Sequence, residues 1–128
     1  MTATGFELRA FVEPDDRARA LGRFLLNRQG YCVIEADSAS LALSLGTSEH
    51  ASIELLLTEI SLPGDISGLR LAEQLRCAKP GLKVMYSCSD AATGQPPAGL
   101  SESQILVSKP YTAENLLKKV EQCLATSS

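Results

Sequence analysis

The stretch I-E-L-L-L-T-E-I-S-L-P, residues 53–63, decides the fold of this chain. Its first part is an almost unbroken apolar run that ends in Thr58 and a single acid, Glu59. Such a run predicts a strand buried on both faces, as in a parallel sheet that helices cover on both sides. Open α/β sheets place their ligands at the carboxyl ends of their strands. We therefore expect Glu59 to lie at a functional site.

Length and composition are those of one globular domain, predicted to span residues 1–128. The 128 residues are 45% hydrophobic and 21% charged, which is ordinary for a globular protein. The net charge of −3 and the lack of a Lys/Arg run argue against nucleic-acid binding. Apolar runs are too short for a membrane span, and the first residues lack the regions of a signal peptide. The 4 cysteines form no C-x-x-C pair, so we expect reduced thiols and a cytoplasmic location.

Short apolar segments elsewhere predict the remaining strands. These segments are Leu8–Val12, Tyr31–Ala36, Leu82–Ser87 and Gln104–Val107. Helical spacing and capping residues fill most of the intervals, with Gly30 and Gly46 ending the first two helices and Thr112 capping the last. Alternating strands and helices predict an α/β domain with a five-stranded parallel sheet of order 2-1-3-4-5.

The first and last helices are the most strongly patterned. In the first, Ala18, Leu21 and Leu25, with Phe24 beside them, form the stripe that we expect to face the sheet. The arginines of this helix fall largely off the stripe, which predicts a solvated face. The last helix has an apolar face made of Leu116, Leu117, Val120, Cys123 and Leu124.

Polar residues follow the ends of four predicted strands and should meet in one crevice. They are Glu13, Glu59, Ser87 and Lys109, with Asp15 just beyond the first. Carboxylates, a hydroxyl and an ammonium group suit either an ion pair or a hard cation such as Mg²⁺. The turn E-P-D-D after the first strand has no glycine-rich segment to bind phosphate. A nucleotide or flavin is therefore not expected.

The ordered set of motifs resembles the receiver domain of bacterial two-component response regulators, over nearly the whole chain. The set comprises the acids after the first strand, Gly30-Tyr31, Glu59, Leu62-Pro63, Gly68, Ser87-Cys88 and Lys109-Pro110. The resemblance implies a flavodoxin-like (CheY-like) three-layer sandwich. It also implies that the strand-three carboxylate takes a phosphoryl group from a histidine kinase and that two acids after strand one hold magnesium. The hydroxyl and the lysine would bind phosphoryl oxygens.

Three positions depart from the family pattern. Glu59 stands where the family has aspartate, Pro14 replaces the second acid and leaves Glu13, and Leu106 stands where many receivers have a switching aromatic. The extra methylene of Glu59 moves its oxygen off the in-line path of phosphoryl transfer. Proline offers no ligand to magnesium, which demands near-ideal octahedral geometry. We therefore expect no phosphorylation at Glu59 and no cofactor.

Two states of Glu59 remain open. In the first, its longer side chain pairs with Lys109 and reaches Ser87, which locks the domain in one state. In the second, Glu59 is a solvated relic that does not influence the surface. A weak magnesium site formed by Glu13, Asp15 and Glu59 also remains open, as does a reactive thiol at Cys88, where we expect a small packing residue.

The sequence predicts a pseudo-receiver that is not an enzyme and acts by protein–protein contact. Its expected partner is a signalling protein, either a histidine kinase, a phosphotransfer protein or an output protein. The resemblance places the contact surface on Ala91–Ala98, Ile105–Val107 and Thr112–Leu124, in a monomer or weak homodimer. One alternative is a receiver that is phosphorylated at another residue, such as Asp15 or Ser87. Another is a small α/β phosphatase that uses the acids after strand one.

Overall fold

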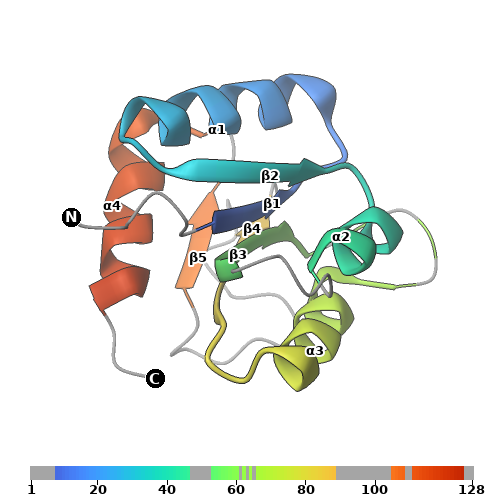
Figure 1. The fold of residues 1–128 in the computed structure, drawn as a ribbon. Helices are drawn as coiled ribbons and strands as arrows, with labels where there is room; N and C mark the ends of the chain where they lie inside the picture. The colour runs from blue at the N-terminus through green and yellow to red at the C-terminus, as the bar shows by residue number, and fades with distance from the viewer. Residues whose placement is uncertain are drawn as a thin grey trace.

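A parallel five-stranded sheet forms the centre of the molecule (Figure 1). The computed structural model describes residues 8–46, 53–60, 62, 64, 66–88, 105–108 and 111–125. The strands lie in the order β2-β1-β3-β4-β5. Their bounds are β1 Leu8–Val12, β2 Cys32–Ala36, β3 Ile53–Glu59, β4 Lys83–Cys88 and β5 Ile105–Ser108. The predicted flavodoxin-like α/β fold is confirmed. Strand β2 begins one residue later than predicted, and β4 and β5 are each shifted by one residue toward the C-terminus.

Helices cover both faces of the sheet and complete the three layers (Figure 1). Helices α1 (Asp16–Arg28) and α4 (Ala113–Ala125) pack on one face. Helices α2 (Ala39–Gly46) and α3 (Gly68–Ala78) pack on the other. No helix in the described part of the chain is both long and apolar enough to cross a membrane.

Strand β3 supplies both halves of the core, as its sequence predicts. Leu55 and Leu57 join the cluster under α1 and α4, whereas Leu56 joins the cluster under α2 and α3. All three are at most 2% exposed. Because side chains alternate along a strand, one apolar run can fill both layers. Burial on both faces fixes the position of β3, and with it the position of Glu59 at its end.

The face that α1 presents to the sheet differs from the prediction. Leu21 and Phe24 are 39% and 54% exposed, whereas Gly22 and Leu26 are buried. A Cβ atom at Gly22 would overlap the ring of Phe11 in β1. The helix therefore approaches the sheet through its smallest residue, which turns Leu21 and Phe24 outward. The predicted stripe was wrong for these two residues.

Helix α4 agrees with the sequence prediction, whereas the cysteines differ in burial. Cys123 is buried, but Cys32 and Cys77 are exposed. The apolar face of α4 packs on the sheet, with Leu116 and Val120 fully buried. The predicted contact segment Ala91–Ala98 lies outside the described residues.

Candidate functional site

Three polar side chains lie next to one another at the carboxyl end of the sheet. Val12, the last residue of β1, pairs in register with Thr58 of β3. The next residues, Glu13 just after β1 and Glu59 at the end of β3, therefore lie side by side. Glu59 pairs in register with Ser87 on β4. Glu13 and Ser87 are 0% exposed and Glu59 is 6% exposed. Buried polar groups need partners inside the protein, and these three have them.

Glu59 is held by β4 and by the loop that leads to α3. The Ser87 hydroxyl donates to Oε2 of Glu59 over 3.1 Å. Beyond Glu59, the Ile60 N–H donates to the Ser87 carbonyl over 3.1 Å, and the Gly68 N–H donates to the Ile60 carbonyl over 2.8 Å. A Cβ atom at Gly68 would overlap the Glu59 carbonyl oxygen. Only glycine therefore allows α3 to begin this close to Glu59.

Glu13 accepts hydrogen bonds at both carboxylate oxygens. Oε1 accepts from the Tyr111 hydroxyl over 3.0 Å, and Oε2 accepts from the Asp15 N–H over 3.1 Å. The backbone carbonyl of Glu13 accepts from Nη1 of Arg19 over 2.9 Å. Side chain and backbone of Glu13 are thus fixed by the start of α1 and by the residue that leads into α4.

Tyr111 is buried against the same end of the sheet. It is 3% exposed, and its ring meets the Phe11 ring edge to face, with centroids 5.7 Å apart and planes at 63°. Burial, reinforced by the negative charge of Glu13, raises the pKa of Tyr111 above its ordinary value. A phenol with a raised pKa keeps its proton at physiological pH, so Tyr111 remains a hydrogen-bond donor to Glu13.

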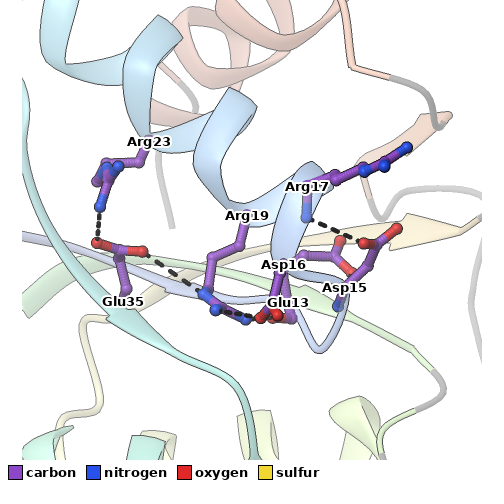
Figure 2. A network of polar contacts seen from close by, with 7 residues as sticks. All are labelled: Glu13, Asp15, Asp16, Arg17, Arg19, Arg23 and Glu35. Carbon is purple, nitrogen blue, oxygen red and sulfur yellow. Dashed lines mark hydrogen bonds and ion pairs between the residues drawn. The ribbon is translucent and has the colours of Figure 1, made fainter.

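Arginines of α1 form an ion-pair network beside Glu13 (Figure 2). Arg19 pairs with Asp16 over 2.6 Å and with Glu35 of β2 over 3.5 Å. Arg23 pairs with the other oxygen of Glu35 over 2.8 Å. The prediction that these arginines form a solvated face was wrong for Arg19, whose side chain is 19% exposed. Its planar guanidinium links the end of β1 to α1 and β2.

The other predicted site residues lie around this centre or outside the described residues. Asp15 is exposed and caps α1, accepting from the Arg17 N–H over 3.0 Å. Pro14 is partly buried between Glu13 and this cap. Cys88 is the last residue of β4, but its side chain lies outside the described part. Lys109 also lies outside it.

A magnesium ion of the kind that the resemblance implies does not fit these residues. Pro14 has no side-chain oxygen, and both oxygens of Glu13 already accept hydrogen bonds from within the protein. Among the described residues, no group of three or more His, Cys, Asp or Glu side chains could hold a metal ion. Magnesium keeps an octahedral shell of oxygens, and the donors that would build it are engaged elsewhere.

Sequence reasoning missed two residues of this site, Tyr111 and Arg19. A weak signal existed for Tyr111, because a tyrosine next to an apolar helix face is buried with its hydroxyl in need of a partner. That signal does not identify the partner, which is 98 residues away in the chain. For Arg19, its spacing from Asp16 on the helix suggests an ion pair, but the contact with the Glu13 carbonyl depends on how α1 packs.

The comparisons with known proteins identify the family. The family model for the response regulator receiver domain matches residues 10–121, from β1 into α4. The chain belongs to this family. It is a response-regulator receiver domain of two-component signalling. Receiver domains are generally signalling modules that interact with histidine kinases and output domains.

Individual known proteins are similar to this chain in sequence or in fold. The transcriptional regulatory protein ResD of Bacillus subtilis is 23% identical over 117 residues, which are 91% of this chain and 48% of ResD. This chain thus spans about half the length of that relative. A receiver protein from Sinorhizobium medicae superposes with a TM-score of 0.78 at 22% identity, covering 91% of this chain and 93% of that one. The receiver domain of the hybrid histidine kinase CckA gives 0.74 at 27% identity, covering 91% and 98%.

Proposed function

We propose that this receiver domain acts through protein–protein contacts, with Glu59 as a fixed charge and not as a phosphoacceptor. The hydrogen bond from Ser87 to Glu59, 3.1 Å long and buried, carries the proposal. In the family, the hydroxyl at the position of Ser87 binds a phosphoryl oxygen. In this chain the Ser87 hydroxyl donates instead to the Glu59 carboxylate.

The length of the glutamate side chain explains this contact. Glu59 and Ser87 are in register on neighbouring strands, and the additional methylene of glutamate carries the carboxylate toward the serine hydroxyl. Phosphoryl transfer needs the attacking oxygen in line with the leaving group. A displacement of about 1 Å can lower the rate about a hundredfold. The orientation that satisfies Ser87 is thus a poor one for attack on a phosphodonor.

The burial of Glu59 favours the locked state over the solvated relic. Glu59 is 6% exposed, and its carboxylate accepts from a side chain that is fully buried. A buried carboxylate with a fixed partner holds its neighbours in one arrangement. The ion pair with Lys109 stays a prediction, since Lys109 lies outside the described residues.

Magnesium is not required for this role. A cation would serve to neutralise charge during phosphoryl transfer, and Pro14 and the engaged oxygens of Glu13 disfavour it. We therefore propose a receiver without a cofactor.

Phosphorylation elsewhere receives no support from the geometry. Ser87 is 0% exposed and its hydroxyl proton is directed to Glu59. Asp15 uses its carboxylate to cap α1. A phosphatase would need a nucleophile at Glu13, whose oxygens instead accept structural hydrogen bonds.

We propose α4 and β5 as the surface that meets a kinase, phosphotransfer or output partner. The outward face of α4 is polar, with Glu114, Lys118 and Gln122 exposed. An open depression of about 420 Å³ lies on this face. It is lined by Thr112, Glu114, Asn115, Lys118, Lys119 and Gln122. Mixed charge and an open shape suit a transient partner in a monomeric or weakly dimeric receiver.

Intact mass after treatment with a small acyl phosphate and magnesium tests the proposal. The natural chain should keep its mass, because Glu59 is turned toward Ser87 and Pro14 supplies no metal ligand. A Pro14→Asp/Glu59→Asp variant serves as the matched control and should gain one acid-labile phosphoryl group. An acid-labile adduct on the natural chain would overturn the proposal, and mapping it would show which residue accepts the group.

A further inference from the structure

We propose that the Tyr111 hydroxyl prevents divalent cations from binding to Glu13, because its hydrogen bond occupies a carboxylate oxygen that a metal would use at this end of the sheet. The inference deepens the proposed function, on which it rests, by naming the residue that keeps the site in its metal-free state. Tyr111 is a positioning residue here, since it acts through Glu13.

The first step is the occupancy of Glu13. Its two carboxylate oxygens accept from the Tyr111 hydroxyl at 3.0 Å and from the Asp15 N–H at 3.1 Å. The side chain is fully buried, so water cannot replace a lost donor. Both contacts favour the orientation that Glu13 has in this structure. A cation would have to compete with both.

The second step is that the tyrosine ring has no easy route away from Glu13. Its edge-to-face contact with Phe11 fixes the ring plane. Phe11 is 1% exposed and lies directly under Gly22 of α1, where even a methyl group would overlap its ring. The stack of α1, Phe11 and Tyr111 therefore directs the hydroxyl at Glu13. Interiors packed to this density do not yield to small displacements.

The third step concerns what a cation would leave behind. Binding at Oε1 of Glu13 would remove the charged acceptor of a phenol that is 3% exposed. The phenol would then keep only a neutral partner, the Ser87 hydroxyl, which also donates to Glu59. Hydrogen bonds to an ionised acceptor are roughly twice as strong as neutral ones, so the exchange opposes metal binding.

The fourth step connects the hydrogen bond between Tyr111 and Glu13 to the proposed contact surface on α4. Tyr111 directly precedes the cap of α4, where the Thr112 N–H donates to the Asn115 side chain over 2.9 Å. The Asn115 N–H donates back to the Thr112 hydroxyl over 3.0 Å. This reciprocal pair makes the first turn of α4 rigid. The hydrogen bond of Tyr111 to Glu13 therefore anchors α4 to the sheet.

Magnesium and manganese titrations of matched variants test the inference. The background is Pro14→Asp, which restores the missing acid, and the comparison is Pro14→Asp with and without Tyr111→Phe. We expect the added Tyr111→Phe change to tighten Mg²⁺ and Mn²⁺ binding about tenfold, since a charge-assisted hydrogen bond no longer competes. Tyr86→Phe in the same background is the control, because Tyr86 is equally buried but faces α2 and α3; it should leave both affinities unchanged.

Equal metal affinity with tyrosine and phenylalanine at position 111 would overturn the inference, and so would equal gains from Tyr86→Phe. Absence of binding in the Pro14→Asp/Tyr111→Phe variant would overturn it too, because Glu13 would then be closed by something else. The proposed function fails only if the natural chain accepts a phosphoryl group, and these metal titrations do not measure phosphorylation. Failure of the inference is therefore distinguishable from failure of the proposed function. Amide resonances of Thr112–Leu116, followed with and without Mg²⁺, report whether release of Tyr111 reaches α4.

Discussion

The two buried carboxylates of the site have partners of different origin. Glu59 takes its hydrogen bond from Ser87, its registered neighbour on the adjacent strand. Glu13 takes one from Tyr111, which is 98 residues away and is positioned by α1 and Phe11. The register of a parallel sheet dictates the first contact, and helix packing dictates the second. Glu59 is thus positioned by the sheet, and Glu13 is positioned by the helical layer that packs on it.

This difference predicts responses that are separable only in part, because the Ser87 hydroxyl also hydrogen-bonds with Tyr111. Changes at Tyr111 should propagate to α1 and α4, which pack on the same face. Changes at Ser87 should propagate to the loop that Ile60 and Gly68 hold in front of α3. Mutations that act on only one carboxylate can therefore measure how far the two halves are independent.

The largest effect is expected from Tyr111→Phe. The change keeps the ring against Phe11 and removes only the donor to a fully buried carboxylate. Hydrogen bonds to charged groups contribute about 1.5–3 kcal/mol, so we expect the free energy of unfolding in urea to fall by about 2 kcal/mol.

A double-mutant cycle with Glu13→Gln assigns the loss to this hydrogen bond. The coupling between Tyr111→Phe and Glu13→Gln should be about 1 kcal/mol or more, as for residues in direct contact. Ser40→Ala, at an exposed position of α2, controls for removal of a hydroxyl and should stay within about 0.5 kcal/mol of the natural chain. A coupling near zero would contradict the assigned contact.

The sequence could predict the contacts that the sheet determines better than those that helix packing determines. The apolar run of β3 and the carboxylate at its end were sufficient to place Glu59 at the carboxyl edge, and the strand order brought Glu13 and Ser87 beside it. The alternation of side chains is a local property of the sequence, and the register follows from the buried pattern once the order of the strands is known.

The contacts that the sequence did not reveal all depend on the packing of α1. Hydrophobic periodicity favoured Leu21 and Phe24 as core residues, but a glycine between them lies over Phe11 and sets the rotation of the helix. The same rotation brings Arg19 to the Glu13 carbonyl. For α4, where no glycine competes with the apolar residues, the predicted face was correct. Shape complementarity between layers is a property of the assembled fold.

Alkaline pH should weaken the fold through Tyr111. The folded-state pKa is raised above the ordinary value of 10.0 by burial, so above pH 10 the unfolded chain releases a proton that the folded chain retains. Stability is therefore fully present below that pH and is lost as the pH rises. The slope approaches about 1.4 kcal/mol per pH unit for one such group.

Urea unfolding between pH 9 and pH 11 measures this loss. The pKa of Tyr86 is also raised by burial, so the natural chain should lose stability faster than the Tyr111→Phe variant, which retains only the Tyr86 contribution. If the free energy of unfolding fell equally with pH in the two proteins, the pKa of Tyr111 would not be raised, and its buried contact with Glu13 would be contradicted.

The smallest effect is expected from Ser87→Ala. The change removes the donor to Oε2 of Glu59, a carboxylate that is 6% exposed where Glu13 is 0% exposed. Because a slightly exposed oxygen recovers part of its hydration, we expect a loss of about 1 kcal/mol in the free energy of unfolding. Combined with Tyr111→Phe, the losses should add to within about 0.5 kcal/mol if sheet and helical layer act independently. A larger coupling would mean that the two carboxylates form one network, so that locking Glu59 and closing Glu13 are a single event.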